Sequence, residues 1–241
     1  MPGDVQPAPS DPAQRRQVYG RLRGRPLRRA QAQSLHEDLP ALSLGTLKQE
    51  KSPHECQELD LGSLFGTREI WLEIGFGSGE HLLHQALRHP HVGMIGCEPY
   101  LNGVASLLSK LRFHRLRNIR IHAGDVRDVL DVLPEGGVSR VFLLYPDPWP
   151  KKRHHRRRFM TPQYLAPLGR ALRIGAELRL ATDVADYVRQ AQEQMPQHGF
   201  ETLSHPAQRH MPWPDWLPTR YENKARRAGR VPYYLTFGKI K

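Results

Sequence analysis

The chain has 241 residues, of which 39% are hydrophobic and 25% charged, a composition that suits one globular α/β domain and excludes a fibrous protein. Its apolar runs are far shorter than the roughly 18 residues of a membrane span, and its N-terminus has no signal-peptide pattern, so we expect a soluble, cytoplasmic protein. The formal net charge of +12 arises in residues 1–30, 151–158 and 217–241, which contribute +5, +6 and +6, while the remaining residues sum to −5.

This distribution of charge indicates a polyanionic partner, because clustered Lys and Arg side chains displace counterions from phosphates. Any single basic run is also typical of a solvated surface or a disordered tail, and for residues 1–30 both interpretations stay open. The two cysteines, Cys56 and Cys97, form no CxxC pair, and the thirteen histidines show no ligand spacing. We therefore expect neither a disulfide framework nor a metal site.

The first 35 residues mix Pro, Gln, Ala and Arg without a helical or strand period. Their apolar surface is too small for independent folding. We therefore predict a flexible basic arm over residues 1–35, followed by a single domain over residues 36–241.

From residue 69 onward, short apolar runs alternate with helical patterns. The patterns predict strands over residues 70–74, 92–97, 119–122, 138–145 and 177–181, and helices over residues 80–88, 102–115, 126–132, 162–172 and 184–194. This alternation predicts an α/β fold with a doubly wound, mostly parallel, Rossmann-like sheet. Residues 231–237 are typical of one more strand, which we expect to pair antiparallel at an edge or within a terminal hairpin.

Acidic residues end five successive predicted strands. In open parallel sheets, ligands bind in the crevice outside the carboxyl ends of the strands. The acids at those ends are therefore candidate site residues: Glu73, Glu98, Asp125, Asp147 and Asp183.

A glycine-rich loop follows the first predicted strand. Gly75, Gly77 and Gly79 allow a tight turn and a close approach of a ligand to the backbone. The dinucleotide fingerprint G-x-G-x-x-G needs a glycine at position 80, where this chain has Glu80, so the spacing disfavours NAD and FAD.

The G-x-G-x-G spacing instead resembles the first motif of class I S-adenosylmethionine-dependent methyltransferases. The resemblance implies S-adenosylmethionine as the cofactor, with Glu73 facing its ammonium group. It also implies that Glu98 accepts both ribose hydroxyls and that Asp125 accepts the exocyclic amine of adenine. Taken alone, Glu73 or Glu98 also fits a loop carboxylate that pairs with an exposed arginine.

The segment Pro146-Asp147-Pro148-Trp149 runs from a predicted buried strand into the basic run 151–158. Its prolines favour an extended backbone and fix the direction of Asp147. This segment resembles the tRNA (guanine-N7)-methyltransferase family, and the glycine loop, Ala181-Thr182-Asp183 and Thr219-Arg220-Tyr221-Glu222 agree with it. The matches span about residues 70–240.

The resemblance implies methyl transfer from S-adenosylmethionine to N7 of a guanine in the variable loop of tRNA. Guanine N7 has a lone pair and no proton, so alignment matters more than base catalysis. The purine becomes cationic during transfer, which gives Asp147 an electrostatic and positioning role as the catalytic residue, next to the cofactor. Trp149 is either a stacking platform or a core residue.

The family pattern also implies which residues bind the substrate, namely Lys151, Asp183, Thr219, Arg220, Tyr221 and Glu222. Of these, Asp183 and Glu222 can accept hydrogen bonds from N1–H and the N2 amine of guanine. The basic run is expected to grip the RNA backbone through Arg153, His154, His155, Arg156, Arg157 and Arg158.

Two alternatives stay open at this level. One is a class I methyltransferase that acts on another base, such as an adenine amine, although such enzymes carry Pro-Pro-aromatic where this chain has Pro148-Trp149. The other is a non-catalytic RNA-binding module, which has no need of Asp125 and Asp147.

Overall fold

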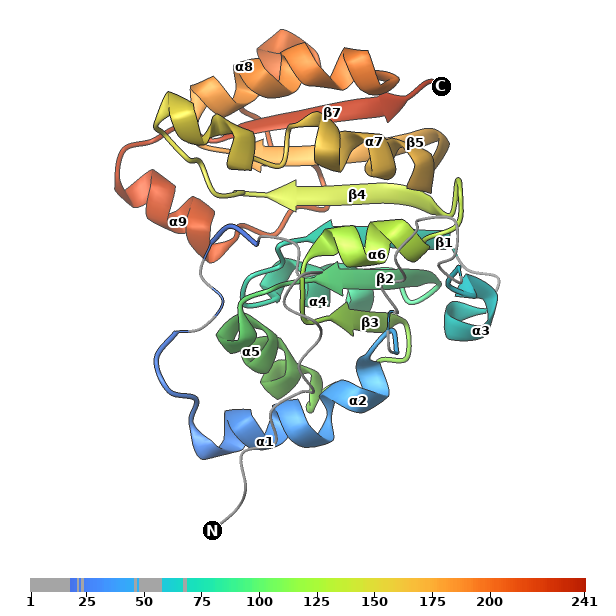
Figure 1. The fold of residues 1–241 in the computed structure, drawn as a ribbon. Coiled ribbons are helices and arrows are strands. Elements are labelled where there is room, and N and C mark those ends of the chain that lie inside the picture. Colours follow the sequence, from blue (N-terminus) through green and yellow to red (C-terminus); the bar gives the residue numbers. More distant parts are fainter. Residues whose placement is uncertain (1–17, 21, 23, 46, 48–57, 67–68) are drawn as a thin grey trace.

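The computed structural model describes residues 18–20, 22, 24–45, 47, 58–66 and 69–241. Seven strands form one sheet in the order β3-β2-β1-β4-β5-β7-β6 (Figure 1). Their bounds are β1 Glu69–Ile74, β2 Val92–Cys97, β3 Ile119–His122, β4 Val138–Leu144, β5 Leu172–Thr182, β6 Phe200–Thr202 and β7 Tyr233–Lys239.

The first five strands are parallel, as the alternating pattern predicts. Pairs such as Ile74 with Cys97 and Ile74 with Leu143 bring the ends of β1, β2 and β4 into register. The predicted C-terminal strand is β7, which runs antiparallel to β5 on one side and to β6 on the other. The edge position belongs to β6, so β7 and β6 form a terminal antiparallel pair.

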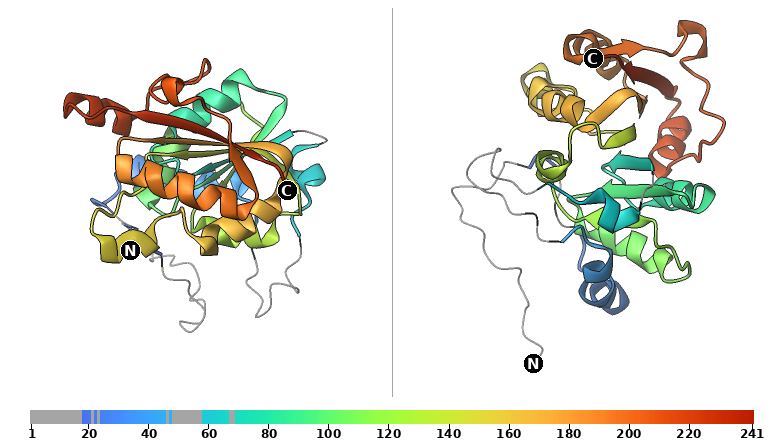
Figure 2. Two further views of the ribbon diagram at one scale, coloured as in Figure 1. Left: turned by 90° about the horizontal axis from the view of Figure 1, so that it is seen from above. Right: turned by 90° about the vertical axis from the view of Figure 1, so that its right-hand side faces the viewer.

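Helices cover both faces of the sheet (Figure 2). The helices are α1 Arg29–Glu37, α2 Leu39–Leu42, α3 Leu61–Phe65, α4 Glu80–Arg88, α5 Leu101–Leu111, α6 Val126–Val132, α7 Pro162–Ala171, α8 Ala185–Gln194 and α9 Arg220–Arg227. Short 3₁₀ turns add η2 Lys152–Arg157, η3 Met195–His198 and η4 Pro206–Gln208.

Strand alternation divides the core into two layers. In β1, Ile70, Leu72 and Ile74 pack with residues of α3, α6, α7 and α8 on one face. Trp71 packs on the other face, with residues of α4 and α5. Glu73 lies two residues after Trp71, so its side chain is on the same face of the sheet and points towards α4.

Part of the predicted arm is ordered secondary structure, while residues 1–17, 21 and 23 lie outside the described residues. Helix α1 crosses the predicted boundary at residue 35 and packs against α5. The preceding segment is held to the start of α5, because Leu101 N–H donates to Leu22 O and Gly24 N–H donates to the Asn102 side chain. The described end of the arm therefore lies against the domain.

Candidate active site

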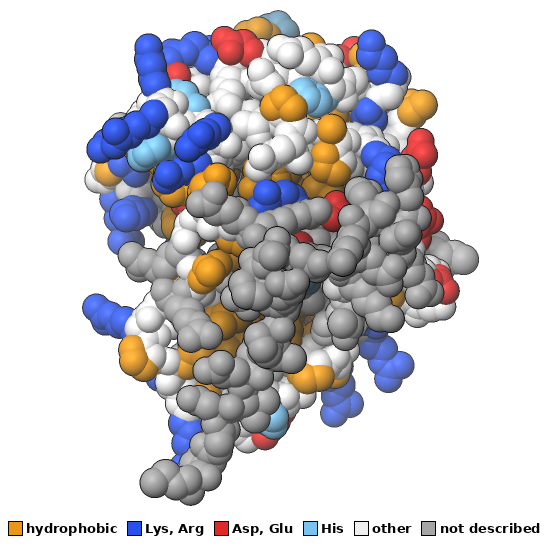
Figure 3. Space-filling view, in the orientation of Figure 1, with side chains coloured by type: hydrophobic (Ala, Val, Ile, Leu, Met, Phe, Trp, Pro, Cys, Tyr) orange, Lys and Arg blue, Asp and Glu red, His pale blue; other side chains and the backbone are white. Residues whose placement is uncertain are grey.

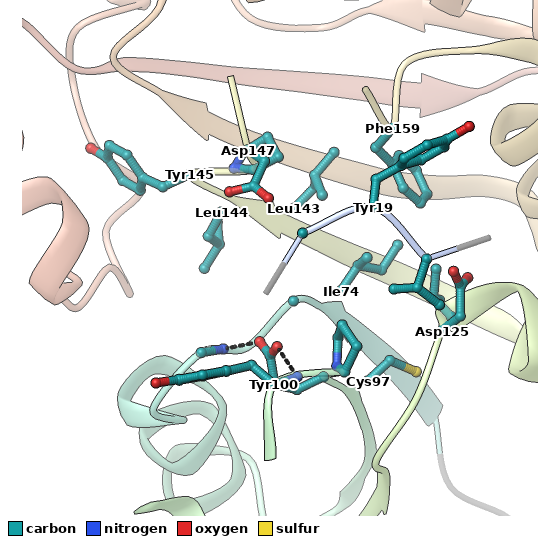
Figure 4. A pocket seen from close by; sticks show the side chains of 18 of the residues that line it. Tyr19, Ile74, Cys97, Tyr100, Asp125, Leu143, Leu144, Tyr145, Asp147 and Phe159 are labelled. Atoms are coloured by element: carbon teal, nitrogen blue, oxygen red, sulfur yellow. Dashed lines mark hydrogen bonds between the residues drawn. The ribbon is translucent and has the colours of Figure 1, made fainter. Parts of the chain in front are cut away.

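A cavity of about 370 Å³ lies at the carboxyl ends of β1, β2 and β4 (Figure 4). Its volume falls within the range of small-molecule sites, about 300–1,000 Å³. The glycine loop and three of the five predicted acids line it, namely Gly75, Gly77, Glu98, Asp125 and Asp147.

The glycine loop joins β1 to α4. Gly75, Gly77 and Gly79 all have positive φ angles, of 70°, 59° and 76°, a conformation that glycine adopts without steric cost. At Gly79 a side chain is also excluded by packing, since a Cβ there would lie 2.6 Å from a methyl carbon of Leu107. The loop therefore needs glycine both for its turn and for its contact with α5.

Glu98 is 7% exposed and lies just after β2. Its two carboxylate oxygens each accept one backbone N–H, from Gly77 at 2.7 Å and from Tyr100 at 2.8 Å (Figure 4). Because Pro99 has no N–H, Tyr100 supplies the first donor after Glu98. Burial raises the pKa of Glu98, the two N–H groups oppose this shift, and the charges of Asp147 and Glu73 reinforce it.

Asp125 caps the N-terminus of α6. Its Oδ1 accepts the backbone N–H of Arg127 at 2.9 Å and the Arg127 Nε–H at 3.0 Å, while Oδ2 accepts from the guanidinium at 2.7 Å. The carboxylate lines the cavity with most of its acceptor sites used.

Glu73 does not line the main cavity. It lies beside a much smaller hollow of about 10 Å³, which shares Gly75, Leu144, Arg220 and Tyr221 with the cavity. Its Oε2 is 2.7 Å from Nδ1 of His81 on α4. Sequence reasoning missed His81, although a histidine and Gln85 four residues apart on a helix share one face.

Asp147 stands on a loop whose backbone is strained on both sides. Tyr145 and Trp149 have positive φ angles of 51° and 40°, a conformation that costs about 1–3 kcal/mol at a non-glycine residue. Asp147 is exposed on one side and faces the cavity on the other. Partial loss of water raises its pKa.

Arg158 holds this loop in place. Predicted to bind RNA, Arg158 is instead 1% exposed, which corrects that prediction. Its Nε donates to Pro148 O at 2.7 Å, and its other nitrogens donate to Gln190 at 2.9 Å and lie 2.8 Å from an Asp186 oxygen. The guanidinium therefore ties the Asp147 loop to α8.

The rest of the basic run presents positive charge next to the cavity. Lys151, Lys152, Arg153 and Arg156 are exposed, and Figure 3 shows Lys and Arg side chains gathered at the upper left, where Figure 1 places η2. His155 Nε2 lies 3.3 Å from an Asp186 oxygen, and His154 packs edge-on to Trp149. Arg157 turns inward and lines the cavity.

Two aromatic residues that sequence reasoning missed flank the cavity. Tyr19 comes from the arm and packs edge-on to Trp149, with ring centres 6.3 Å apart, while Arg157 lies over both rings. Tyr100, on the opposite side, carries the N–H that binds Glu98. An aromatic residue inside a basic, apolar-poor arm is a weak signal for a place beside the cavity.

The start of α9 lies against the glycine loop. Thr219 caps the helix by accepting the Glu222 N–H, Arg220 donates to the Ser78 hydroxyl at 3.0 Å, and Tyr221 lines the cavity. Asp183, after β5, pairs with Arg230.

Glu222, predicted to read guanine, is 1% exposed and does not line the cavity. Its carboxylate accepts from Trp216 Nε1 and Tyr234 OH, each at 2.8 Å, and from Arg226 Nε at 2.9 Å. This corrects the prediction for Glu222, because these donors leave the carboxylate occupied and direct it into the core. Lys151 is exposed and also lies outside the cavity lining.

Within the described part of the chain, no group of three or more His, Cys, Asp or Glu side chains is arranged to hold a metal ion. Over the same residues, no helix has the length and apolar character needed to cross a membrane. Cys97 lines the cavity as a buried free thiol.

Solved structures with this fold include methyltransferases of ribosomal RNA. The 16S rRNA methyltransferase KamB matches with a TM-score of 0.56 at 16% identity, covering 80% of this chain and 95% of that one. The 16S rRNA (adenine(1408)-N(1))-methyltransferase from Catenulisporales acidiphilia matches with a TM-score of 0.55 at 15% identity, covering 80% and 93%. At these identities the likeness concerns the fold alone, and it confirms the predicted fold class.

Sequence relatives are far closer. A family model described as "Putative methyltransferase" matches residues 67–235. The tRNA (guanine-N(7)-)-methyltransferase of Ruegeria pomeroyi is 57% identical, over 94% of this chain and 96% of that protein. Proteins of the same name from Paracoccus denitrificans and Agrobacterium fabrum are 50% and 43% identical, over 92% and 91% of this chain and 94% and 93% of theirs. The chain therefore belongs to the tRNA (guanine-N7)-methyltransferase family.

Proposed function

We propose that this protein transfers a methyl group from S-adenosylmethionine to N7 of a guanine in the variable loop of tRNA, in the cytoplasm where tRNA acts. The observation that carries the proposal is one cavity with Glu98 and Asp147 in its wall and exposed cations of the 151–158 run beside it. A small-molecule site and a cationic surface suited to phosphates thus meet at the carboxyl ends of the parallel strands. The names of the close relatives support the same reaction.

The residues present fit the cofactor. Each Glu98 oxygen accepts one N–H and retains one lone-pair direction, so the carboxylate can accept both ribose hydroxyls. Asp125 Oδ2 retains one direction for the adenine amine. Glu73 would hold the ammonium group, and the backbone at Gly75, Gly77 and Gly79 would follow the methionine portion. The bound cofactor supplies a methyl group on a positively charged sulfur.

Asp147 is the proposed catalytic residue. Guanine N7 needs no deprotonation, so the site has to align the base and offset the positive charge that develops on the purine. The Asp147 carboxylate faces the cavity, and its strained loop is held by Arg158. Preorganisation of this kind costs nothing at the moment of transfer.

Recognition of guanine needs an acceptor for N1–H and the N2 amine, because N7 must stay free. Asp183, which also lies outside the cavity lining but at the end of β5, is the proposed reader, with its carboxylate oriented by Arg230. Thr219, Arg220 and Tyr221 are proposed to close over the base, and Glu222 to hold the start of α9 in place. The base has to leave its stack to enter the cavity.

The RNA backbone is proposed to bind Lys151, Lys152, Arg153 and Arg156, the exposed cations of the run. His154, His155 and Arg157 lie on the same turn and are proposed to border the RNA path. Affinity for tRNA should therefore fall steeply with salt.

The deciding experiment is incubation with methyl-labelled S-adenosylmethionine and bulk unmodified tRNA, followed by nucleoside analysis. Label in 7-methylguanosine is expected. The matched control is Asp147→Asn, which should still bind tRNA but transfer far less label to it in the same time. Label in an adenine methylated at its amine would favour the hypothesis of a class I methyltransferase that acts on another base. No label with folded protein and bound cofactor would favour a non-catalytic RNA-binding module.

A further inference from the structure

We propose that His81 is a positioning residue for the cofactor, which acts by orienting the Glu73 carboxylate and is itself oriented by the segment that leads into α9. The inference rests on the proposed role of Glu73 towards the cofactor's ammonium group. It adds a residue outside the cavity lining and assigns its ring nitrogens definite hydrogen-bonding roles.

The sheet and α4 bring the two side chains together. Glu73 points to the α4 face of the sheet, and His81 and Gln85 lie one turn apart on the helix side that faces it. His81 is 2% exposed and Gln85 1%. The distance from His81 Nδ1 to Glu73 Oε2 is 2.7 Å, which is typical of a hydrogen bond to an ionised group. Among the described residues, Glu73 Oε1 has no hydrogen-bond partner.

The backbone carbonyl of Asp215 determines which end of the Gln85 amide faces His81. A carbonyl oxygen only accepts, so the Gln85 side-chain atom 3.1 Å from it must be the amide nitrogen. The same nitrogen lies 3.2 Å from His81 Nε2. Gln85 therefore offers its second N–H to His81 Nε2, and in the tautomer that accepts it Nδ1 carries the hydrogen and donates to Glu73.

Ring packing fixes the position of the imidazole. Phe142 lies 4.7 Å from the His81 ring centre and Trp216 lies 5.3 Å from it. Trp216 also donates its indole N–H to Glu222 at 2.8 Å. The segment before α9 is thus linked to His81 in two ways. Trp216 contacts the ring directly, and the Asp215 carbonyl is linked to it through Gln85.

A further ion pair holds this segment on the sheet. Asp215 accepts from Arg179 of β5 at 2.8 Å, so its carbonyl is presented to Gln85 from a fixed position. Glu73, His81, Gln85 and the backbone of residue 215 therefore form one continuous hydrogen-bonded chain. It runs from the cofactor side of the site to the segment that begins the proposed substrate-closing helix.

The test compares two ligands that differ at the amino acid group. S-adenosylhomocysteine carries the ammonium group, and 5′-methylthioadenosine lacks the whole amino acid portion. The variant His81→Phe keeps the ring volume and removes the donor, and His81→Asn keeps an N–H near the position of Nδ1. Titration calorimetry on the full chain gives both dissociation constants.

We expect His81→Phe to weaken the binding of S-adenosylhomocysteine about tenfold, equivalent to about 1.4 kcal/mol. The affinity for 5′-methylthioadenosine should change less than about twofold. His81→Asn should recover part of the loss. Equal weakening of both ligands would mean that His81 only supports the fold and would overturn the proposal. Unchanged affinity for both would overturn it as well.

Glu73→Gln separates this inference from the role of Glu73 itself. If Glu73→Gln weakens S-adenosylhomocysteine selectively and His81→Phe does not, the His81 proposal alone is wrong. If Glu73→Gln shows no selectivity, the assigned role of Glu73 is wrong and the inference fails with it. Should His81→Phe not fold, Gln85→Leu gives the same test, since loss of the donor to Nε2 should produce a smaller but equally selective effect. An unchanged ratio of the two affinities in Gln85→Leu would overturn the proposal.

Discussion

Neighbouring arginines of the basic run are expected to respond in opposite ways to the same substitution. Arg158 is buried and bound to Pro148, Gln190 and Asp186, whereas Arg156 is exposed. We expect Arg158→Gln to destabilise the fold and slow methyl transfer. The matched variant Arg156→Gln should weaken tRNA binding and leave stability almost unchanged.

The size of the Arg158 effect follows from its partners. A hydrogen bond that involves a charged group contributes about 1.5–3 kcal/mol, and Arg158 makes two, at 2.7 and 2.9 Å, together with an ion pair to Asp186 at 2.8 Å. Asp186 is 39% exposed and regains water when its partner is lost, and glutamine can keep one of the three contacts. A net loss of about 2–4 kcal/mol in the free energy of unfolding is therefore expected. For a chain of this size, that corresponds to a fall in Tm of about 4–16 °C.

Thermal and urea unfolding of both variants measure their difference in stability. The salt dependence of tRNA affinity measures their difference in electrostatic contribution to binding. Arg156→Gln should stay within about 0.5 kcal/mol of the parent protein and lower the salt slope by up to about one unit. Arg158→Gln should leave that slope unchanged. Equal stability of the two variants, or a reduced slope for Arg158→Gln, would refute the assignment of Arg158 to the interior.

Three further predictions concern individual carboxylates. Glu98→Gln should weaken cofactor binding by about 1–3 kcal/mol. Because the pKa of Glu98 is raised, cofactor affinity of the parent protein should fall on acidification at a higher pH than it would with an exposed glutamate. Calorimetry across pH should show no such fall for the variant. Asp147→Asn should keep cofactor and tRNA affinity while its single-turnover rate drops by roughly 100-fold or more, and a parent rate that rises tenfold per pH unit through neutrality would instead make Asp147 a base. Glu222→Ala should cost about 2–4 kcal/mol in urea unfolding, because the Trp216 and Tyr234 donors lose their buried acceptor, and a stable variant with altered base preference would return Glu222 to guanine recognition.

The sequence predicted the regular α/β core well because each element there carries its own periodic signal. The strands over 92–97 and 119–122 and the helices over 80–88 and 126–132 match the observed elements at both ends. Helix α9 escaped prediction because Arg220–Arg227 is almost entirely polar. It is held by the buried Glu222 network and not by an apolar face. Strand β6 has only three residues, too few for an alternation to appear.

The positions of the candidate site residues were predictable where a motif fixes the backbone, and less so where tertiary packing determines which way a side chain points. Asp147, Glu98, Gly75 and Gly77 lie together at one cavity because they follow adjacent parallel strands. Arg158 and Arg156 look alike in a run of like charges, and only the contact with α8 separates them. The spacing of His81 and Gln85 places both on one helix face, but it does not identify their partners, which are Glu73 on β1 and the Asp215 carbonyl.

The placement of charge explains how one small domain can bind a cationic cofactor and a polyanionic substrate side by side at the carboxyl ends of its parallel strands. Glu98, Asp125 and Asp147 line the cavity together with Arg157 and Arg220, and Glu73 lies beside it; carboxylates favour a sulfonium or an ammonium group and disfavour phosphate. Lys151, Arg153 and Arg156 lie outside, where phosphates can be neutralised without entering the cavity. In the proposed transfer, the positive charge would pass from the sulfur to the purine, and Asp147, which lines the cavity, is the carboxylate proposed to offset it. Transfer to a nitrogen that carries no proton needs a well-placed anion more than a base, and this is the basis of the role proposed for Asp147.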